Sequence, residues 1–84
     1  MTGSFDELRA GLADVAERLS SAGQFVRQAG VLIDDALGQL TRLSEQHSES
    51  LVPVELRRAS DELRHGMQLI NSGSAAVSDI EARL

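Results

Sequence analysis

The sequence contains no cysteine, tryptophan, tyrosine or lysine, and it has a single proline. Without cysteine the chain has neither disulfides nor thiolate metal sites, which are common supports of a small domain. Its only aromatic residues are Phe5 and Phe25, so the 42% apolar content is mostly Leu, Ile, Val and Ala, which suits helix packing better than a sheet. The 84 residues form one domain (1–84), and we expect oligomerisation to supply the missing support.

A basic cluster and a long apolar run are missing as well. Thirteen acidic residues against eight basic ones give a net charge of −5, which disfavours binding to nucleic acid or to an anionic membrane. No stretch approaches the ~18 apolar residues of a membrane span, and no signal-peptide pattern opens the chain. We therefore expect no nucleic-acid, membrane or small-molecule partner, and a cytoplasmic location or export without a cleavable signal.

Apolar residues recur at alternating steps of three and four in two segments, the signature of a coiled-coil seam. The first series runs from Phe5 to Leu43 and the second from Leu56 to Leu84. Ser4 and Glu7 fit a capping box, which predicts that the first helix starts at Ser4.

A polar segment separates the two series, and Pro53 follows it. Proline is tolerated in the first turn of a helix and disfavours helical geometry in the residue before it. The sequence thus predicts an all-α fold, a long antiparallel helical hairpin with helices at about 4–46 and 53–84 and a turn at 47–52.

Folding the chain at this turn predicts a register in which large side chains meet small ones. Large and small residues then alternate between the helices, which would allow close packing. It would also offset the cost of about 1 kcal/mol for each glycine inside a helix. The predicted layers are Leu40–Ala59, Ala36–Leu63, Ile33–Gly66, Ala29–Ile70, Val26–Gly73 and Ala22–Val77.

Two glycine-containing segments leave alternatives open. Residues 71–74 could form a turn that separates a short C-terminal helix, and residues 20–23 could break the first helix and give a three-helix bundle. The unbroken heptad series through both segments favours continuous helices.

The predicted hairpin leaves apolar residues without a partner. In the predicted register the first helix overhangs the second, which exposes Phe5, Leu8 and Leu12. Near the centre, Phe25 and Leu32 share one flank with Leu69 and Ala76, and Leu37 and Met67 are expected on the opposite flank. Such a broad apolar surface predicts that two hairpins pack into a four-helix bundle. The predicted partner-binding residues are Phe5, Leu8, Leu12, Phe25, Leu32 and Leu69.

No residue pattern indicates a catalytic or metal site. His47 lies near Glu45 and Glu49, but the second histidine, His65, is on the other helix, and a zinc site needs three or four protein ligands. The glycines are dispersed rather than clustered in a phosphate-binding loop, and a thin hairpin offers no deep cleft. We expect no enzymatic activity, no metal and no cofactor.

In length, mid-chain turn, acidic balance and heptads on both arms, the chain resembles the small Trp-X-Gly helical hairpins of bacterial type VII secretion. It has Ser48–Leu51 at the turn in place of Trp-X-Gly and lacks the Tyr-centred C-terminal export signal. The resemblance implies hairpins that dimerise into four-helix bundles and are exported folded, as adaptors or effectors.

Two functions follow as expectations. The first is a non-enzymatic protein-interaction module, a scaffold or adaptor that forms a homodimer or pairs with a related helical protein. The second is a signal-less exported effector or partner protein of a type VII-like secretion system. An acidic inhibitor of a basic partner is a third option, which the dispersed charges disfavour.

Overall fold

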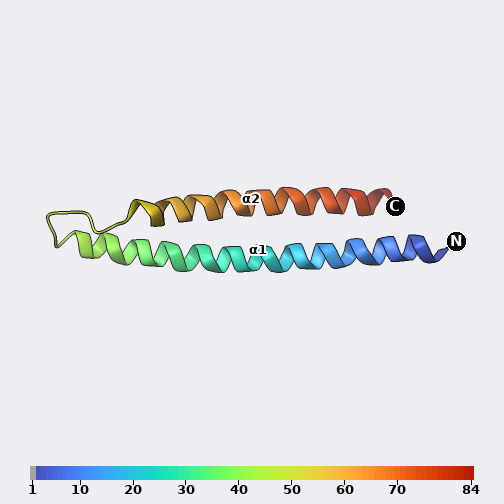
Figure 1. Cartoon of the computed structure of the whole chain (residues 1–84), viewed down its shortest axis with the longest axis horizontal. Coiled ribbons are helices and arrows are strands. Elements are labelled where there is room, and N and C mark those ends of the chain that lie inside the picture. The colour runs from blue at the N-terminus through green and yellow to red at the C-terminus, as the bar shows by residue number, and fades with distance from the viewer. Residues whose placement is uncertain (1) are drawn as a thin grey trace.

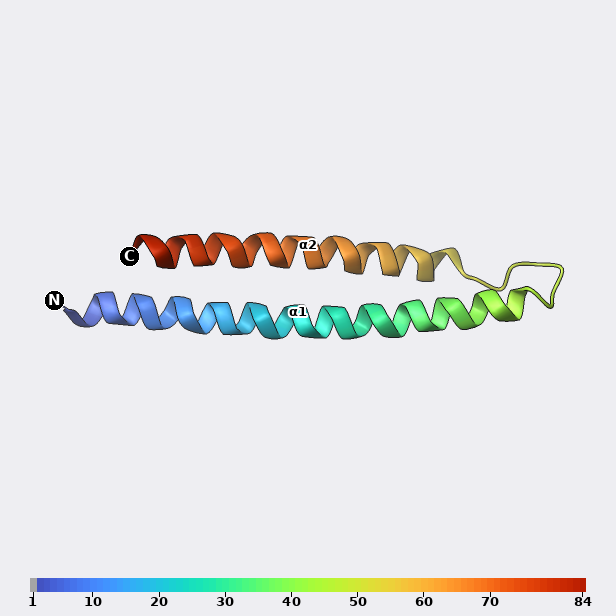
Figure 2. The ribbon, with the colours of Figure 1, turned by 180° about the vertical axis from the view of Figure 1, so that it is seen from behind.

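Two helices joined by one loop make up the protein. The computed structural model describes residues 2–84, with side chains from residue 3 onwards. Helix α1 spans Thr2–Ser44 and α2 spans Val54–Arg83, and no strand occurs in this range. The helices run antiparallel and side by side along the whole of α2 in both views (Figures 1 and 2). The predicted all-α helical hairpin is confirmed.

The hairpin is a thin rod. Its Cα atoms extend over 71 × 15 × 14 Å, and their radius of gyration is 19.5 Å. A compact chain of this length would have a radius of gyration of about 12 Å. Both helices pass through their glycine-containing segments without interruption, so neither the break at residues 20–23 nor the turn at 71–74 forms.

The start of α1 differs from the prediction, whereas the start of α2 agrees with it. Since α1 already includes Thr2, Ser4 lies within its first turn and is not a cap, and the predicted helix start at Ser4 is wrong. At the other helix, Pro53 has the extended angles φ −66° and ψ 137°, and α2 follows at Val54. Proline there lacks only an N–H that a first helical turn leaves unpaired.

The loop folds back on the end of α1 through Ser44. The Ser44 hydroxyl donates to the Leu40 carbonyl (2.7 Å) and accepts a hydrogen bond from the Leu51 N–H (2.7 Å). The loop first extends beyond α1 and then returns, so that α2 begins beside the body of α1 rather than at its tip (Figure 1). This return path fixes which residues of the two helices face each other.

The register differs from the predicted one. A Cβ placed on Gly23 would lie 3.1 Å from the Met67 Cε atom and 3.7 Å from the Ile70 Cγ2 atom. Ile70 therefore faces Gly23, six residues before the expected Ala29. A Cβ on Gly66 or Gly73 would meet nothing within 4 Å. The predicted layers, including Ile33–Gly66 and Val26–Gly73, are therefore wrong.

Helix α1 is also rotated relative to the expected seam. Leu12, Leu19, Val26, Ile33 and Leu40 are half-buried, as the heptad predicts. The alternate positions facing α2 are one residue later than expected, at Ala16, Gly23, Gly30 and Leu37. Small residues at three of these positions let α2 approach on this side of the seam. The larger Val15, which was expected in the seam, stays exposed.

Ion pairs link residues one turn apart on the outer surface of each helix. Arg18 contacts Asp14 at 2.9 Å and Arg58 contacts Glu62 at 3.2 Å. Arg64 contacts Asp61 at 3.1 Å. All of these side chains are largely exposed, so each pair contributes at most about 1 kcal/mol.

Candidate partner-binding surface

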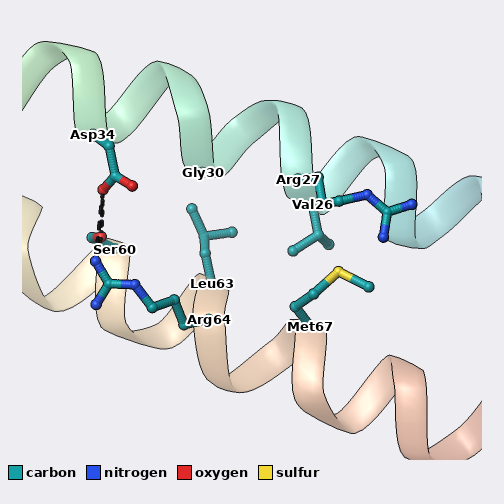
Figure 3. Close-up of a pocket in the computed structure, with 8 residues that line it drawn as sticks. All are labelled: Val26, Arg27, Gly30, Asp34, Ser60, Leu63, Arg64 and Met67. Atoms are coloured by element: carbon teal, nitrogen blue, oxygen red, sulfur yellow. Dashed lines mark hydrogen bonds and ion pairs between the residues drawn. The ribbon is translucent and has the colours of Figure 1, made fainter.

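The two long sides of the hairpin differ in polarity. On one side the Ser60 hydroxyl, on α2, donates a 2.7 Å hydrogen bond to Asp34 Oδ1, on α1 (Figure 3). Arg64 Nη2 donates to the Ser60 oxygen at 3.3 Å and lies 4.0 Å from Asp34 Oδ1. Arg64 thus brings its charge close to the Asp34 carboxylate across the helix pair. We call this side, with Asp34, Ser60 and Arg64, the polar side.

A shallow pocket of about 130 Å³ lies beside this cluster. Leu63 points into it from α2 toward Gly30, and Val26 lies over Met67 (Figure 3). Met67 and Leu37 were expected on an outer flank, but both are half-buried between the helices because each helix is rotated relative to the expected seam. The surface of the pocket is mostly apolar, which makes it a poor site for polar chemistry.

The opposite side is apolar and uncovered. On each helix, residues spaced seven apart form a row along this side of the seam. The rows of the two helices lie on the same side because the helices are antiparallel. Phe25 and Leu32 flank the first row, and Leu69 and Ala76 flank the second. We call this surface the apolar face. It consists of Leu8, Val15, Ala22, Phe25, Ala29, Leu32, Ala36 and Leu43 on α1, and of Ala59, Gly66, Leu69, Gly73, Ala76 and Ile80 on α2.

The large side chains of the apolar face are open to solvent. Phe25 is 70% exposed, Leu32 69% and Leu69 60%. Gly23 contacts Ile70, and Val26 shares a pocket with Met67, so Phe25 lies at the same level along the rod as Leu69. The structure thus places three of the predicted site residues together at the centre of one face.

The N-terminal residues of the predicted site divide into two groups. The start of α1 extends past the end of α2 (Figure 1), and Phe5 and Leu8 are exposed there. Arg9 covers part of Phe5, with its guanidinium carbon 5.0 Å from the ring centroid. Leu12 is half-buried because the shifted register carries α2 further along α1 than expected. The prediction that Leu12 overhangs is wrong.

Sequence reasoning missed several exposed apolar residues. Val15, Leu43 and Ile80 were assigned to the seam but are 40–51% exposed and border the apolar face. Val31 and Val54 are 60% and 71% exposed on other parts of the surface. Their position in the heptad relative to the rotated seam would have identified the first three, but no local signal singles out Val31 or Val54.

The glycines of α2 lie on this face. Gly66 and Gly73 are in the α2 row that borders Leu69, and a Cβ built on either would meet no atom within 4 Å beyond the backbone of its own helix turn and its chain neighbours. Packing within the hairpin therefore does not require glycine at these positions. Each lowers helix stability by about 1 kcal/mol relative to alanine.

Comparison with known proteins identifies no relative, since no family model, no curated protein and no solved structure matches this chain. Neither helix, within the described residues, has a segment long and apolar enough to cross a membrane. In the same part of the chain, no three His, Asp or Glu side chains lie close enough to hold a metal ion. The feature that distinguishes this hairpin is therefore its apolar face.

Proposed function

We propose that this protein is a non-enzymatic protein-interaction module, a helical hairpin that acts as a scaffold or adaptor by packing its apolar face against another helical chain. The observation that carries the proposal is the exposure of Phe25, Leu32 and Leu69 on a hairpin in which no apolar side chain of the described residues is buried. The preferred assembly is a four-helix bundle, formed with a second hairpin of the same or a related sequence.

The lack of a buried core supports this function. A folded chain must offset the entropy of ordering its backbone, about 1–2 kcal/mol per residue, largely by burying apolar surface. The single hairpin only half-buries the leucines and isoleucines of its seam. A second pair of helices over the apolar face would complete their burial.

The exposed residues are numerous enough to drive association. Burial of a Leu or Phe side chain contributes about 1.5–3 kcal/mol, whereas association costs about 4–15 kcal/mol in lost translational and rotational freedom. One side chain would not offset that cost. Several anchors on one face, with Phe25, Leu32 and Leu69 at its centre, would.

The experiment is light scattering of the purified chain from low to high micromolar concentration, for wild type and a variant with Phe25→Ser and Leu32→Ser. We expect wild type to assemble and the variant to dissociate. The matched control is Val31→Ser with Val54→Ser, because these residues are as exposed but lie outside the apolar face. If the wild-type hairpin were monomeric at high micromolar concentration and bound no helical protein, the proposed function would be rejected.

A second candidate is a signal-less exported effector or partner protein of a type VII-like secretion system. It is supported by the two-helix hairpin with its loop in mid-chain, the shape that the resemblance to the Trp-X-Gly hairpins implies. The test is an immunoblot of culture medium and cells from a secretion-competent host and from an isogenic strain lacking the secretion ATPase. Equal amounts of the protein in both media, or none in either, would reject this candidate.

A further inference from the structure

We propose, building on the function above, that the apolar face is occupied by a second copy of this chain, with α1 of each copy lying over α2 of the other and Phe25 seated between Gly66 and Gly73 of that copy. The proposal specifies the occupant and the arrangement. A two-fold axis parallel to the length of the rod relates the two hairpins.

The apolar face is complementary to itself. A two-fold interface uses the same surface on both chains, so it needs projections and hollows together on one face. The apolar face has both, since Phe25 and Leu32 project from the α1 half and are about 70% exposed. The α2 half carries small residues at Ala59, Gly66 and Gly73. A partner of unrelated sequence would not require this match within one chain.

The projecting and the small residues also match in level along the rod. Phe25 lies level with Leu69, and Gly66 and Gly73 are one turn to either side of Leu69. A two-fold axis along the rod preserves levels, and it therefore brings Phe25 of one copy over the gap between the two glycines of the other. An axis across the rod would instead set α1 on α1 and α2 on α2, and would not bring Phe25 over the α2 glycines.

Gly66 and Gly73 are not needed for packing within the hairpin. A Cβ at Gly66 or Gly73 would touch nothing in its own chain, so the hairpin alone would be at least as stable with alanine there. Close approach of another chain supplies a reason for glycine at both positions. Because Asp34 faces Ser60, Leu32 lies level with the part of α2 between Ala59 and Gly66. In the dimer, Leu32 of one copy would therefore meet the gap between Ala59 and Gly66 of the other.

Charge and area are compatible with two identical faces. The central α1 residues of the apolar face, between Ala22 and Ala36, are uncharged, and Glu62 at the edge of α2 is paired with Arg58 of its own chain. A face as long as α2, about 45 Å, and 15 Å wide gives roughly 1,300 Å² for the two copies together. Stable interfaces bury about 1,200–2,000 Å².

The test is sedimentation equilibrium of the full chain, with helicity followed by circular dichroism. We expect wild type to be dimeric at micromolar concentration, and Gly66→Ala with Gly73→Ala to raise the dimer Kd at least tenfold while helicity is kept. The control is Gly30→Ala with Gly38→Ala, which gains the same helix propensity away from the apolar face. The control should not raise the dimer Kd. A Gly66/Gly73 variant that dimerises as tightly as wild type overturns the proposal.

Disulfide trapping tests the direction of the two-fold axis. Chains with Phe25→Cys and chains with Leu69→Cys are mixed and oxidised, and we expect the mixed species to predominate. Predominant self-linkage of the Phe25→Cys chain would overturn the arrangement.

Binding experiments distinguish a homodimer from an interaction module that binds another protein. A monomeric wild type that binds another helical protein, with binding lost in the Phe25→Ser and Leu32→Ser variant, removes the second copy but keeps the interaction module. A monomer that binds no helical protein removes both.

Discussion

Ser60, the most buried polar residue of the described chain at 4% exposure, donates its hydroxyl hydrogen to Asp34 on the opposite helix. The apolar heptad pattern alone does not indicate that Asp34, rather than another residue of α1, lies opposite Ser60. Polar residues at seam positions are known to specify register at some cost in stability. The bond to the Asp34 carboxylate favours one register, because a shift of one heptad along α1 would bring Arg27 or Thr41 to this position instead.

The Ser60–Asp34 bond makes the first prediction. Ser60→Ala should lower the free energy of unfolding by about 1 kcal/mol, since the acceptor is charged but half exposed and regains water when the bond is lost. The measurement is urea unfolding followed by circular dichroism at fixed protein concentration. Ser72→Ala, at an exposed position of the same helix, is the control and should change stability by less than about 0.5 kcal/mol. Equal effects of the two substitutions would contradict the role of Ser60.

Register is tested directly by engineered disulfides, because the chain has no cysteine of its own. Ile70→Cys combined with Gly23→Cys should oxidise to an intramolecular disulfide, since the Ile70 side chain lies against Gly23. Ile70→Cys combined with Ala29→Cys matches the layer expected from the sequence and should remain reduced or link two chains. Free-thiol titration and non-reducing mass analysis distinguish the results. A monomeric disulfide in the second variant alone would show that the register is the other one.

Some of this structure follows from the sequence, and some does not. The heptad steps correctly predict two helices, and Pro53 correctly predicts the start of the second. The register depends on the path of the loop, which the Ser44 hydroxyl holds against the end of α1 through the Leu51 N–H. This is a contact between residues seven apart in an irregular segment, and neither periodicity nor propensity encodes it.

The rotation of α1 could not be read from periodicity for a related reason. Residues one position apart in the heptad, such as Val15 and Ala16, are both apolar, so two overlapping apolar stripes fit the pattern equally well. In the structure the later stripe faces α2, and its Gly23 lies against Met67 and Ile70. Exposure of Phe25, Leu32 and Leu69 was nevertheless predicted correctly, since these residues lie outside both stripes.

Gly23 and Gly30 should respond differently to the same substitution. Gly30→Ala meets no atom within 4 Å and should raise the free energy of unfolding by up to about 1 kcal/mol through helix propensity. Gly23→Ala brings its Cβ to 3.1 Å from the tip of Met67, so part of this gain is lost in moving a flexible side chain. Gly23→Leu should destabilise the hairpin by about 1–3 kcal/mol through overpacking. Thermal unfolding of the three variants at one concentration measures the order of their stabilities. A Gly23→Leu protein as stable as wild type would contradict the close helix contact at this position.

Protein concentration should change thermal stability. In the described residues of the single hairpin no apolar side chain is buried, and the proposed assembly would add apolar burial that the hairpin alone lacks. Mass action then raises the unfolding temperature as concentration increases, because partner binding stabilises only the folded state. Calorimetric scans at about 5, 50 and 500 µM should show this rise for wild type and a much smaller one for Phe25→Ser with Leu32→Ser. A midpoint independent of concentration, from a chain that stays monomeric throughout, would mean that the half-buried seam alone sustains the fold.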